Sequence, residues 1–329
     1  MKRAPKDHGL VRYLSRKDVE RAGLSMSSII GAVDSMFRLK GLGQTEMPPK
    51  PGIHPLPDAF IHAMPAFIPK AKAAGIKWVS GYPQNQRRGL PYISGLLILN
   101  DPSTGIPSAV MDCTWITAQR TGAATAVAAK YLARPDSSSL GLLACGVQGR
   151  SNLEALACLF KLKTVKAYDL YPEIASKFAR EMGKKLELDI EPVNNPEEAV
   201  RGLDMVVTSG PILKRPKPVI EAGWLAEGAF ACPLDFDSYW TAEAFEEADK
   251  LATDDLSQLA YYRAEGYFRR MPAAYADLGQ IACGAKPGRG SSRERVFCVN
   301  LGLALEDMAT AVLIKRRAER LGLGRLLPL

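Results

Sequence analysis

The spacing of apolar residues in the first 125 residues alternates between strand-like and helical. "LVRYLS" reads as a strand, and the segment after Ser25 predicts a helix because its apolar residues recur at helical intervals: Ile29, Ile30, Val33, Met36 and Phe37. Beyond a proline-rich stretch, "AFIHAMPAFI", "AAGIKWVSGYP", "SGLLILN" and "IPSAVMDC" read as strands, and the turn "DPSTG" makes the last two a predicted hairpin. Antiparallel strands with polar loops predict an α+β unit.

From about Ala126 the pattern becomes an alternation of short strands and helices. "SLGLLAC", "TVKAYDL", "LDMVVTSG" and "GAFACPLDF" are strand-like, and helical or loop segments such as "NPEEAVRG" separate them. This alternation is typical of a doubly wound parallel sheet, so we predict an α/β fold with a Rossmann-type dinucleotide-binding domain over residues 126–299. Residues 300–329 read as helix again, and we expect no strand after them.

The first strand of this region leads into an incomplete dinucleotide-binding turn. Ala144, Gly146 and Gly149 of "LACGVQGRSN" occupy the three positions of G-x-G-x-x-G. We expect Ala144 to replace the first glycine with a negative φ, and Gly146 and Gly149 to allow a close pyrophosphate and close helix packing. The helix is expected to begin near Ser151, where its amides favour an anion. A surface turn rich in small residues is the alternative.

An acid at the end of the next strand supports the cofactor hypothesis. Asp169 in "AYDLY" follows the turn at about the 20-residue spacing of a carboxylate that holds the ribose hydroxyls. The same carboxylate would repel a 2′-phosphate, and "DLYPE" has no arginine, so we expect NAD(H) and, less readily, NADP(H). The other residues assigned to the cofactor are Val147, Gln148, Thr208 and Ser209. Without a cofactor, Asp169 would be an ordinary strand-end acid.

Composition removes several classes of function. The six cysteines form no C-x-x-C pair and there are three histidines, so we expect reduced thiols and no metal site. No apolar run is long enough to span a membrane, and the basic start has no apolar run after it, so we expect a cytoplasmic protein without a secretory signal. The net charge of +8 gathers partly at the end of the last helix, and no nucleic-acid motif accompanies it.

Three cations in the first half are candidates for substrate binding. Lys50 lies in "MPPKPGIHP", Lys77 in an apolar strand pattern, and Arg120 in a helix of small residues. Each alone could be a structural ion pair or a surface residue. Together they would form a clamp for a carboxylate.

The segment that carries two of these cations resembles the ornithine cyclodeaminase/μ-crystallin family. "KWVSGYPQN", "DPSTG" and "TAQRTGA" occur in the family's order, "GVQGR" matches its cofactor turn, and "NLGLALEDMATA" matches its C-terminal helix. The resemblance covers nearly the whole chain and is weakest between about residues 180 and 290. It implies a homodimer, and a substrate-binding and dimerisation domain built from residues 1–125 with 300–329.

The resemblance also implies roles for individual residues. Lys77 and Arg120 would hold the substrate carboxylate, and Lys77 would also be a catalytic residue. Lys50 occupies a position where relatives often have arginine. The catalytic aspartate would be Asp237, with Asp235 as the alternative; otherwise Asp237 only forms a turn. Two further substrate-site residues depart from the family pattern. They are Tyr92, where relatives often carry a small hydroxyl residue, and His62, near the place of an acid for a distal amine.

The expected function is therefore an NAD-dependent enzyme acting on a small-molecule 2-amino or 2-imino acid. The best single hypothesis is ornithine cyclodeaminase, which converts L-ornithine to L-proline and ammonia. A cyclic ketimine reductase and an alanine dehydrogenase-like enzyme are alternatives. A non-catalytic crystallin-like protein that binds NAD(P)H and a ligand is an alternative of another class, and a DNA-binding regulator would rest on charge alone.

Overall fold

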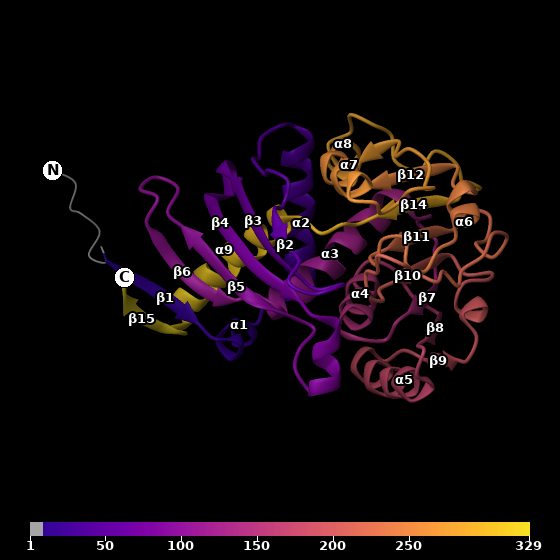
Figure 1. Cartoon of the computed structure of the whole chain (residues 1–329), viewed down its shortest axis with the longest axis horizontal. Coiled ribbons are helices and arrows are strands. Elements are labelled where there is room, and N and C mark those ends of the chain that lie inside the picture. The colour runs from indigo at the N-terminus through magenta and orange to yellow at the C-terminus, as the bar shows by residue number, and fades with distance from the viewer. Residues whose placement is uncertain (1–8) are drawn as a thin grey trace. The chain divides into compact units, whose positions relative to one another are not determined.

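A computed structural model describes residues 9–329, which divide into two compact units (Figure 1). The first contains the chain up to Ser25, Gln44–Thr117 and Ala304–Leu329, and the second contains Met26–Gly43 and Ala118–Leu303. Residues 1–8, on which the expected absence of a secretory signal rests, lie outside the described residues. Within the described chain, no helix is both long and apolar enough to cross a bilayer.

The first unit is a seven-stranded sheet in the order β15-β1-β6-β5-β4-β3-β2. Its strands are β1 (Leu10–Leu14), β2 (Gly52–Ile53), β3 (Phe60–Ile68), β4 (Ala73–Gly81), β5 (Ile93–Asn100), β6 (Pro107–Asp112) and β15 (Arg325–Pro328). The predicted antiparallel strands β3 to β6 are confirmed. The short strand β2 lies in the proline-rich stretch and was not predicted; it pairs antiparallel with β3, whereas β1 pairs with β6 in parallel. Its helices are α1 (Arg16–Arg21), α9 (Ala304–Leu321), and the short turns η1 (Pro69–Ala71) and η2 (Pro83–Arg88).

Helix α9 lies against β3, β4 and β5 of this sheet (Figure 1). Burial alternates along β3 because one face of the strand is turned toward the helix: Met64, Ala66 and Ile68 are buried, with the half-buried Pro65 and Phe67 between them.

The expectation that no strand follows the last helix is wrong. Gly322 and Gly324 adopt positive φ angles of 65° and 83°, which turn the chain back after α9. Residues 325–328 then pair antiparallel with β1, with Leu10 opposite Pro328. All four residues of β15 are exposed, so no hydrophobic alternation marks this strand in the sequence.

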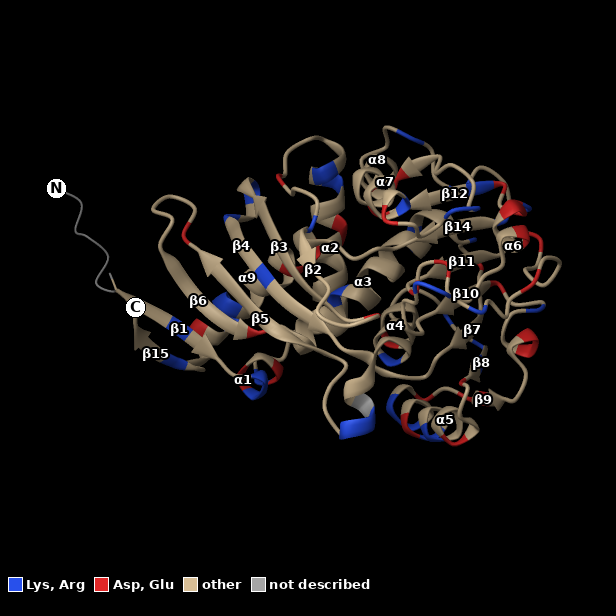
Figure 2. Ribbon diagram, viewed as in Figure 1, with Lys and Arg blue, Asp and Glu red and all other residues tan. Residues whose placement is uncertain are grey.

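The second unit is an eight-stranded sheet in which every described pair is parallel, in the order β13-β12-β14-β11-β10-β7-β8-β9. Its strands are β7 (Ser139–Leu143), β8 (Thr164–Tyr168), β9 (Ile190–Val193), β10 (Met205–Thr208), β11 (Phe230–Pro233), β12 (Lys250–Thr253), β13 (Ala276–Asp277) and β14 (Val296–Val299). The predicted α/β fold with a parallel sheet is confirmed. The central strands β7, β10, β11 and β14 carry no charged residue (Figure 2), as expected for strands covered on both faces.

Helices and a short turn connect and cover this sheet. They are α2 (Met26–Gly41), α3 (Thr114–Leu132, in this unit from Ala118), α4 (Val147–Ala157), α5 (Pro172–Leu186), η3 (Pro196–Ala199), α6 (Ala242–Glu246), α7 (Leu256–Ala264) and α8 (Leu278–Ala282). The predicted helix after Ser25 is α2, which packs against α8. A Cβ on Gly41 would lie 2.0 Å from the Gly279 carbonyl oxygen, so a glycine permits this close approach.

Candidate functional site

The turn after β7 contains a left-handed alanine. Ala144 has φ +76°, so the expected negative φ is wrong. Glycine normally fills such a position because an L-residue pays a strain of about 1–2 kcal/mol there. Hydrogen bonds hold Ala144 in place: its N–H donates to the Tyr168 carbonyl (2.9 Å), and its carbonyl accepts from the Ser209 hydroxyl (3.1 Å). Ser209 therefore completes the turn through its side chain.

Helix α4 begins at Val147, four positions earlier than the predicted start near Ser151. Gly146 is its N-cap, no side chain caps it, and a Cβ added to Gly146 would meet no atom within 4 Å. The space beside Gly146, at the N-terminus of α4, is thus open next to the first amides of the helix, those of Val147 and Gln148. A Cβ on Gly149 would lie 2.5 Å from the Ala144 carbonyl oxygen, so Gly149 has the predicted close-packing role. This arrangement fits a pyrophosphate.

Asp169 braces the same turn. Its Oδ2 accepts a hydrogen bond from the Cys145 N–H (2.8 Å), and its Oδ1 accepts one from the Tyr171 N–H (3.1 Å). A carboxylate has about four acceptor positions, so these bonds leave capacity for the two hydroxyls of a ribose. These contacts are compatible with both hypotheses for Asp169, an ordinary acid at the end of a strand and a carboxylate that binds a ribose.

A second acid is buried at the carboxyl ends of β10 and β11. Asp235 is fully buried, and its Oδ1 accepts from the Thr208 hydroxyl (2.7 Å) while its Oδ2 accepts from the Gly210 N–H (3.0 Å). Burial raises the pKa of Asp235 to about 7, against the lowering effect of these two donors. The Trp240 indole in turn donates to the Thr208 oxygen (3.1 Å). With a pKa of about 7, a fraction of Asp235 is protonated at neutral pH.

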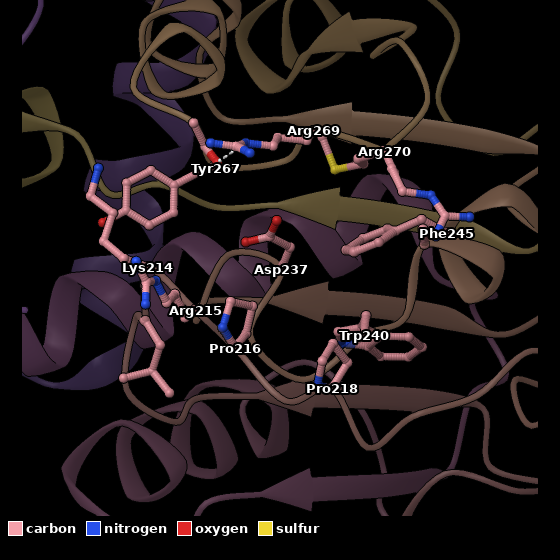
Figure 3. A pocket seen from close by; sticks show the side chains of 14 residues that line it. Lys214, Arg215, Pro216, Pro218, Asp237, Trp240, Phe245, Tyr267, Arg269 and Arg270 are labelled. Carbon is pink, nitrogen blue, oxygen red and sulfur yellow. Dashed lines mark hydrogen bonds between the residues drawn. The ribbon is translucent and has the colours of Figure 1, made fainter.

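Asp237 has different surroundings. It lines a cavity of about 520 Å³ (Figure 3), and its Oδ2 accepts from the Phe268 N–H (2.8 Å). Burial raises the pKa of Asp237 above its usual range. Four cations also line this cavity: Lys214, Arg215, Arg269 and Arg270. The two candidate aspartates thus differ in burial and in what they face.

The first unit contains four of the predicted substrate residues. The ammonium of Lys77 is 2.7 Å from Asp307 of α9, and both side chains are buried, so the ion-pair alternative for Lys77 is observed. Lys50 is also buried, and Tyr92 is half-buried. Burial, with the positive charges of Lys50, His54 and Lys77, lowers the pKa of His62 to about 3. His62 is therefore neutral at physiological pH.

Arg120 lies in the second unit, on α3, and is 6% exposed. A Cβ on Gly302 would lie 2.7 Å from its Nη1, so the guanidinium packs against a residue that has no side chain. The turn that carries Gly302 is fixed by Asp254, whose Oδ2 accepts from the N–H groups of Leu301 and Gly302 at 2.7 Å each. The sequence reading missed Asp254 and Gly302. "TDD" after a strand-like segment was the available signal for Asp254.

The structure also identifies a buried amide that the sequence reading missed. Asn300 follows β14 directly, and its backbone N–H donates to Pro233 of β11 (3.3 Å). Its side chain is 4% exposed, and its Nδ2 has no hydrogen-bond partner among the described residues. Within residues 9–329, no group of three or more histidine, cysteine or acidic residues has the geometry to hold a metal ion.

The predicted residues thus fall into two sets. Lys50, His62, Lys77 and Tyr92 belong to the first unit. Arg120 and all the residues assigned to the cofactor and to acid–base chemistry belong to the second. In the second unit, the carboxyl ends of adjacent parallel strands gather the Ala144 turn, Asp169 and Asp235, where open α/β sheets bind their ligands.

Comparison with known proteins identifies relatives over almost the full length. The sequence model of the ornithine cyclodeaminase/mu-crystallin family matches residues 12–321. The chain is 36% identical over 316 residues to the nodulation efficiency protein NfeD of Rhizobium meliloti, covering 95% of this chain and 97% of that protein.

Two solved structures share the fold. One is the Thermococcus litoralis Δ1-pyrroline-2-carboxylate reductase in complex with NADH and L-proline, with a TM-score of 0.87, 34% identity, and coverage of 96% of this chain and 99% of that one. The other is an archaeal alanine dehydrogenase dimer with bound NAD, with a TM-score of 0.87, 34% identity and coverage of 97% and 99%. The chain therefore belongs to the ornithine cyclodeaminase/mu-crystallin family, which contains NAD-dependent amino and imino acid oxidoreductases and cyclodeaminases.

Proposed function

We propose that this protein is an NAD(H)-dependent oxidoreductase that interconverts 2-imino acids and 2-amino acids. The observation that carries the proposal is the place of Asp235, a buried acid at the carboxyl ends of β10 and β11 that accepts from Thr208 and Gly210; burial raises its pKa to about 7. Reduction of an imine needs a proton as well as a hydride, and an acid with such a pKa can supply that proton at neutral pH. Asp237 remains the alternative acid.

The turn after β7 would hold the cofactor. The amides of Val147 and Gln148 would bind the pyrophosphate, and the remaining acceptor positions of Asp169 would bind the ribose hydroxyls. NAD(H), when bound, gives or takes the hydride. Ser209 would act through the turn, because its hydroxyl donates to Ala144.

The cations would hold the substrate carboxylate. The ammonium of Lys77 is buried and pairs with Asp307 of the same unit, which fixes its direction. Arg120 offers a planar fork that suits a carboxylate. Lys50 would add a third positive charge, and Tyr92 a half-buried hydroxyl.

Within this class we favour substrates that carry one amino or imino group over L-ornithine. A diamine needs an acceptor for its distal ammonium, and His62 would have to supply it. The positive charges of Lys50 and Lys77 act on His62 and would repel a second ammonium. The solved relatives named for pyrroline-2-carboxylate and alanine act on such substrates.

A rate survey tests the proposal. NADH oxidation is measured at 340 nm with Δ1-pyrroline-2-carboxylate and with pyruvate plus ammonium, and NAD+ reduction with L-proline and L-alanine. We expect turnover with at least one imine. Ammonia release from L-ornithine, without turnover of any imine, would favour the cyclodeaminase. NADH binding without turnover in any assay would favour the non-catalytic alternative.

The first prediction concerns cofactor choice. Asp169 would face the 2′-phosphate of NADPH, so we expect NADH to bind at least about tenfold more tightly, which corresponds to about 1.4 kcal/mol. Quenching of protein fluorescence measures both dissociation constants. The variant Asp169→Asn keeps an acceptor for the Cys145 N–H and removes the negative charge. It should therefore bring the dissociation constants of NADH and NADPH closer together. Equal affinity of the wild type for both cofactors would refute the assignment.

The second prediction concerns assembly, and we propose a homodimer. Trp78 and Leu96 are directly opposite each other on β4 and β5, and they are 49% and 44% exposed. Tyr13 is 40% exposed on β1 of the same sheet. Exposed apolar groups of this size on a sheet favour burial against a second copy.

Light scattering at micromolar concentration measures the mass of the assembly. We expect a dimer for the wild type and a shift toward monomer for Trp78→Glu with Leu96→Glu. Leu170→Glu is the matched control, because Leu170 is 72% exposed in the second unit. A wild-type monomer, or a double variant that stays fully dimeric, would contradict the prediction.

A further inference from the structure

A chain of hydrogen bonds runs from an indole to the buried acid in the second unit. Trp240 donates to Thr208 (3.1 Å), and Thr208 donates to Oδ1 of Asp235 (2.7 Å). The three side chains are at most 1% exposed, so water does not compete for these bonds. Thr208 was assigned to the cofactor from sequence, but its hydroxyl is already engaged on both sides.

The direction of each bond follows from the chemistry of the groups. An indole N–H can only donate, so it occupies an acceptor position on the Thr208 oxygen. While Asp235 is ionised its Oδ1 can only accept, so the single hydroxyl hydrogen of Thr208 is directed to it. If Oδ1 carried the proton and donated to Thr208, the Thr208 hydrogen would turn away from its one acceptor among the described residues, so the neutral acid favours its proton on Oδ2. That oxygen can still accept from the Gly210 N–H (3.0 Å) while it carries the proton.

The surroundings keep this chain in one arrangement. Thr208 ends β10, and its carbonyl accepts from the N–H of Leu234, the residue before Asp235 (2.9 Å). The Trp240 ring meets that of Phe297 edge-on, with 4.9 Å between centroids, and lies beside Phe245 at the cavity wall (Figure 3). Close packing of this kind leaves the indole little freedom to turn its N–H away.

We propose that Thr208, oriented by Trp240, is a positioning residue that fixes the Asp235 carboxyl and places its exchangeable proton on Oδ2. The inference rests on the proposed function, in which Asp235 exchanges a proton with the substrate. The hydrogen bond from Thr208 to Oδ1 of Asp235 stabilises the ionised carboxylate more than the neutral acid. Removing the Thr208 hydroxyl should therefore shift the titration of Asp235 upward.

The titration of Asp235 can be followed without substrate or cofactor, by NMR of protein with ¹³C-labelled aspartate carboxyl groups. The Asp235 signal is assigned by its loss in Asp235→Asn. We expect a wild-type midpoint of about 7. In Thr208→Val, which has nearly the same shape without the hydroxyl, the midpoint should rise by about one pH unit or more. Thr208→Ser restores the hydroxyl and should return the midpoint to within about half a unit of wild type.

A Thr208→Val midpoint within about 0.3 unit of wild type would overturn the inference. If this variant does not fold, Trp240→Phe takes its place: it frees the hydroxyl to turn away, so a smaller upward shift is expected and an unchanged midpoint overturns the inference. Failure of the proposed function gives a different result. Normal turnover of Asp235→Asn would remove Asp235 from the chemistry, whatever the titrations show.

Discussion

Asp235→Asn is expected to lower turnover by about two to four orders of magnitude, because asparagine cannot give or take the proton. NADH affinity should change little, since the proposed pyrophosphate and ribose contacts, the Val147 and Gln148 amides and Asp169, follow β7 and β8 rather than β11. The new amide nitrogen would face the Gly210 N–H, a mismatch of about 1–3 kcal/mol. A lower thermal midpoint is therefore expected as well. Steady-state rates, a fluorescence titration with NADH and a thermal scan measure the three effects.

Asp237→Asn is the matched control. An asparagine there can still accept from the Phe268 N–H, and it suits a turn as well as aspartate does. We expect near-normal turnover. The reverse pattern, with Asp237→Asn inactive and Asp235→Asn active, would transfer the acid–base role to Asp237.

The wild-type pH profile provides a further check on Asp235. The pKa of about 7 lies above the ordinary value for aspartate, so the group is protonated over more of the neutral range than usual. In the oxidative direction the base must be ionised, so kcat/KM should rise with pH and level off above about 7. In the reductive direction the acid must be protonated, so kcat/KM should fall across the same range.

Arg120→Ala is expected to reduce kcat/KM about thirtyfold to several thousandfold, mainly through a higher KM. Loss of a charge-assisted pair in a desolvated site costs about 2–5 kcal/mol. Arg120→Lys keeps the charge without the planar fork, so it should recover part of the loss. Steady-state kinetics over a range of substrate concentrations separate KM from turnover.

Lys130→Ala is the control for helix α3. Lys130 is on the same helix, exposed, and paired with Asp34 at 3.2 Å. Its loss should leave kcat/KM within about twofold, as for most surface pairs. An Arg120→Ala variant that behaves like this control would refute the carboxylate role.

The cofactor turn shows how far the sequence could predict the site. The strand, the turn, the helix and the close packing at Gly149 follow from periodicity and glycine placement. The positive φ of Ala144 does not, because local preference opposes it. It is held by Tyr168 and Ser209, which come from two other strands' ends.

Contacts between residues far apart in the chain could not be predicted from the sequence, because no local pattern records them. The strand pattern placed Lys77 in a buried position, but its partner Asp307 is on a helix 230 positions later (307 minus 77). The choice between Asp235 and Asp237 also depends on a neighbouring strand, since Thr208 and Gly210 supply the donors that Asp235 accepts. Strand β15 was missed because its exposed residues carry no apolar alternation.

Isotope transfer tests the central claim most directly. The protein is incubated with (4R)- or (4S)-deuterated NADH and either Δ1-pyrroline-2-carboxylate or pyruvate plus ammonium, and the amino acid product is analysed by mass spectrometry. The proposal predicts proline or alanine with one deuterium on the α-carbon, from one of the two NADH isomers. Amino acid without deuterium from either isomer, or no amino acid from either imine, would contradict it.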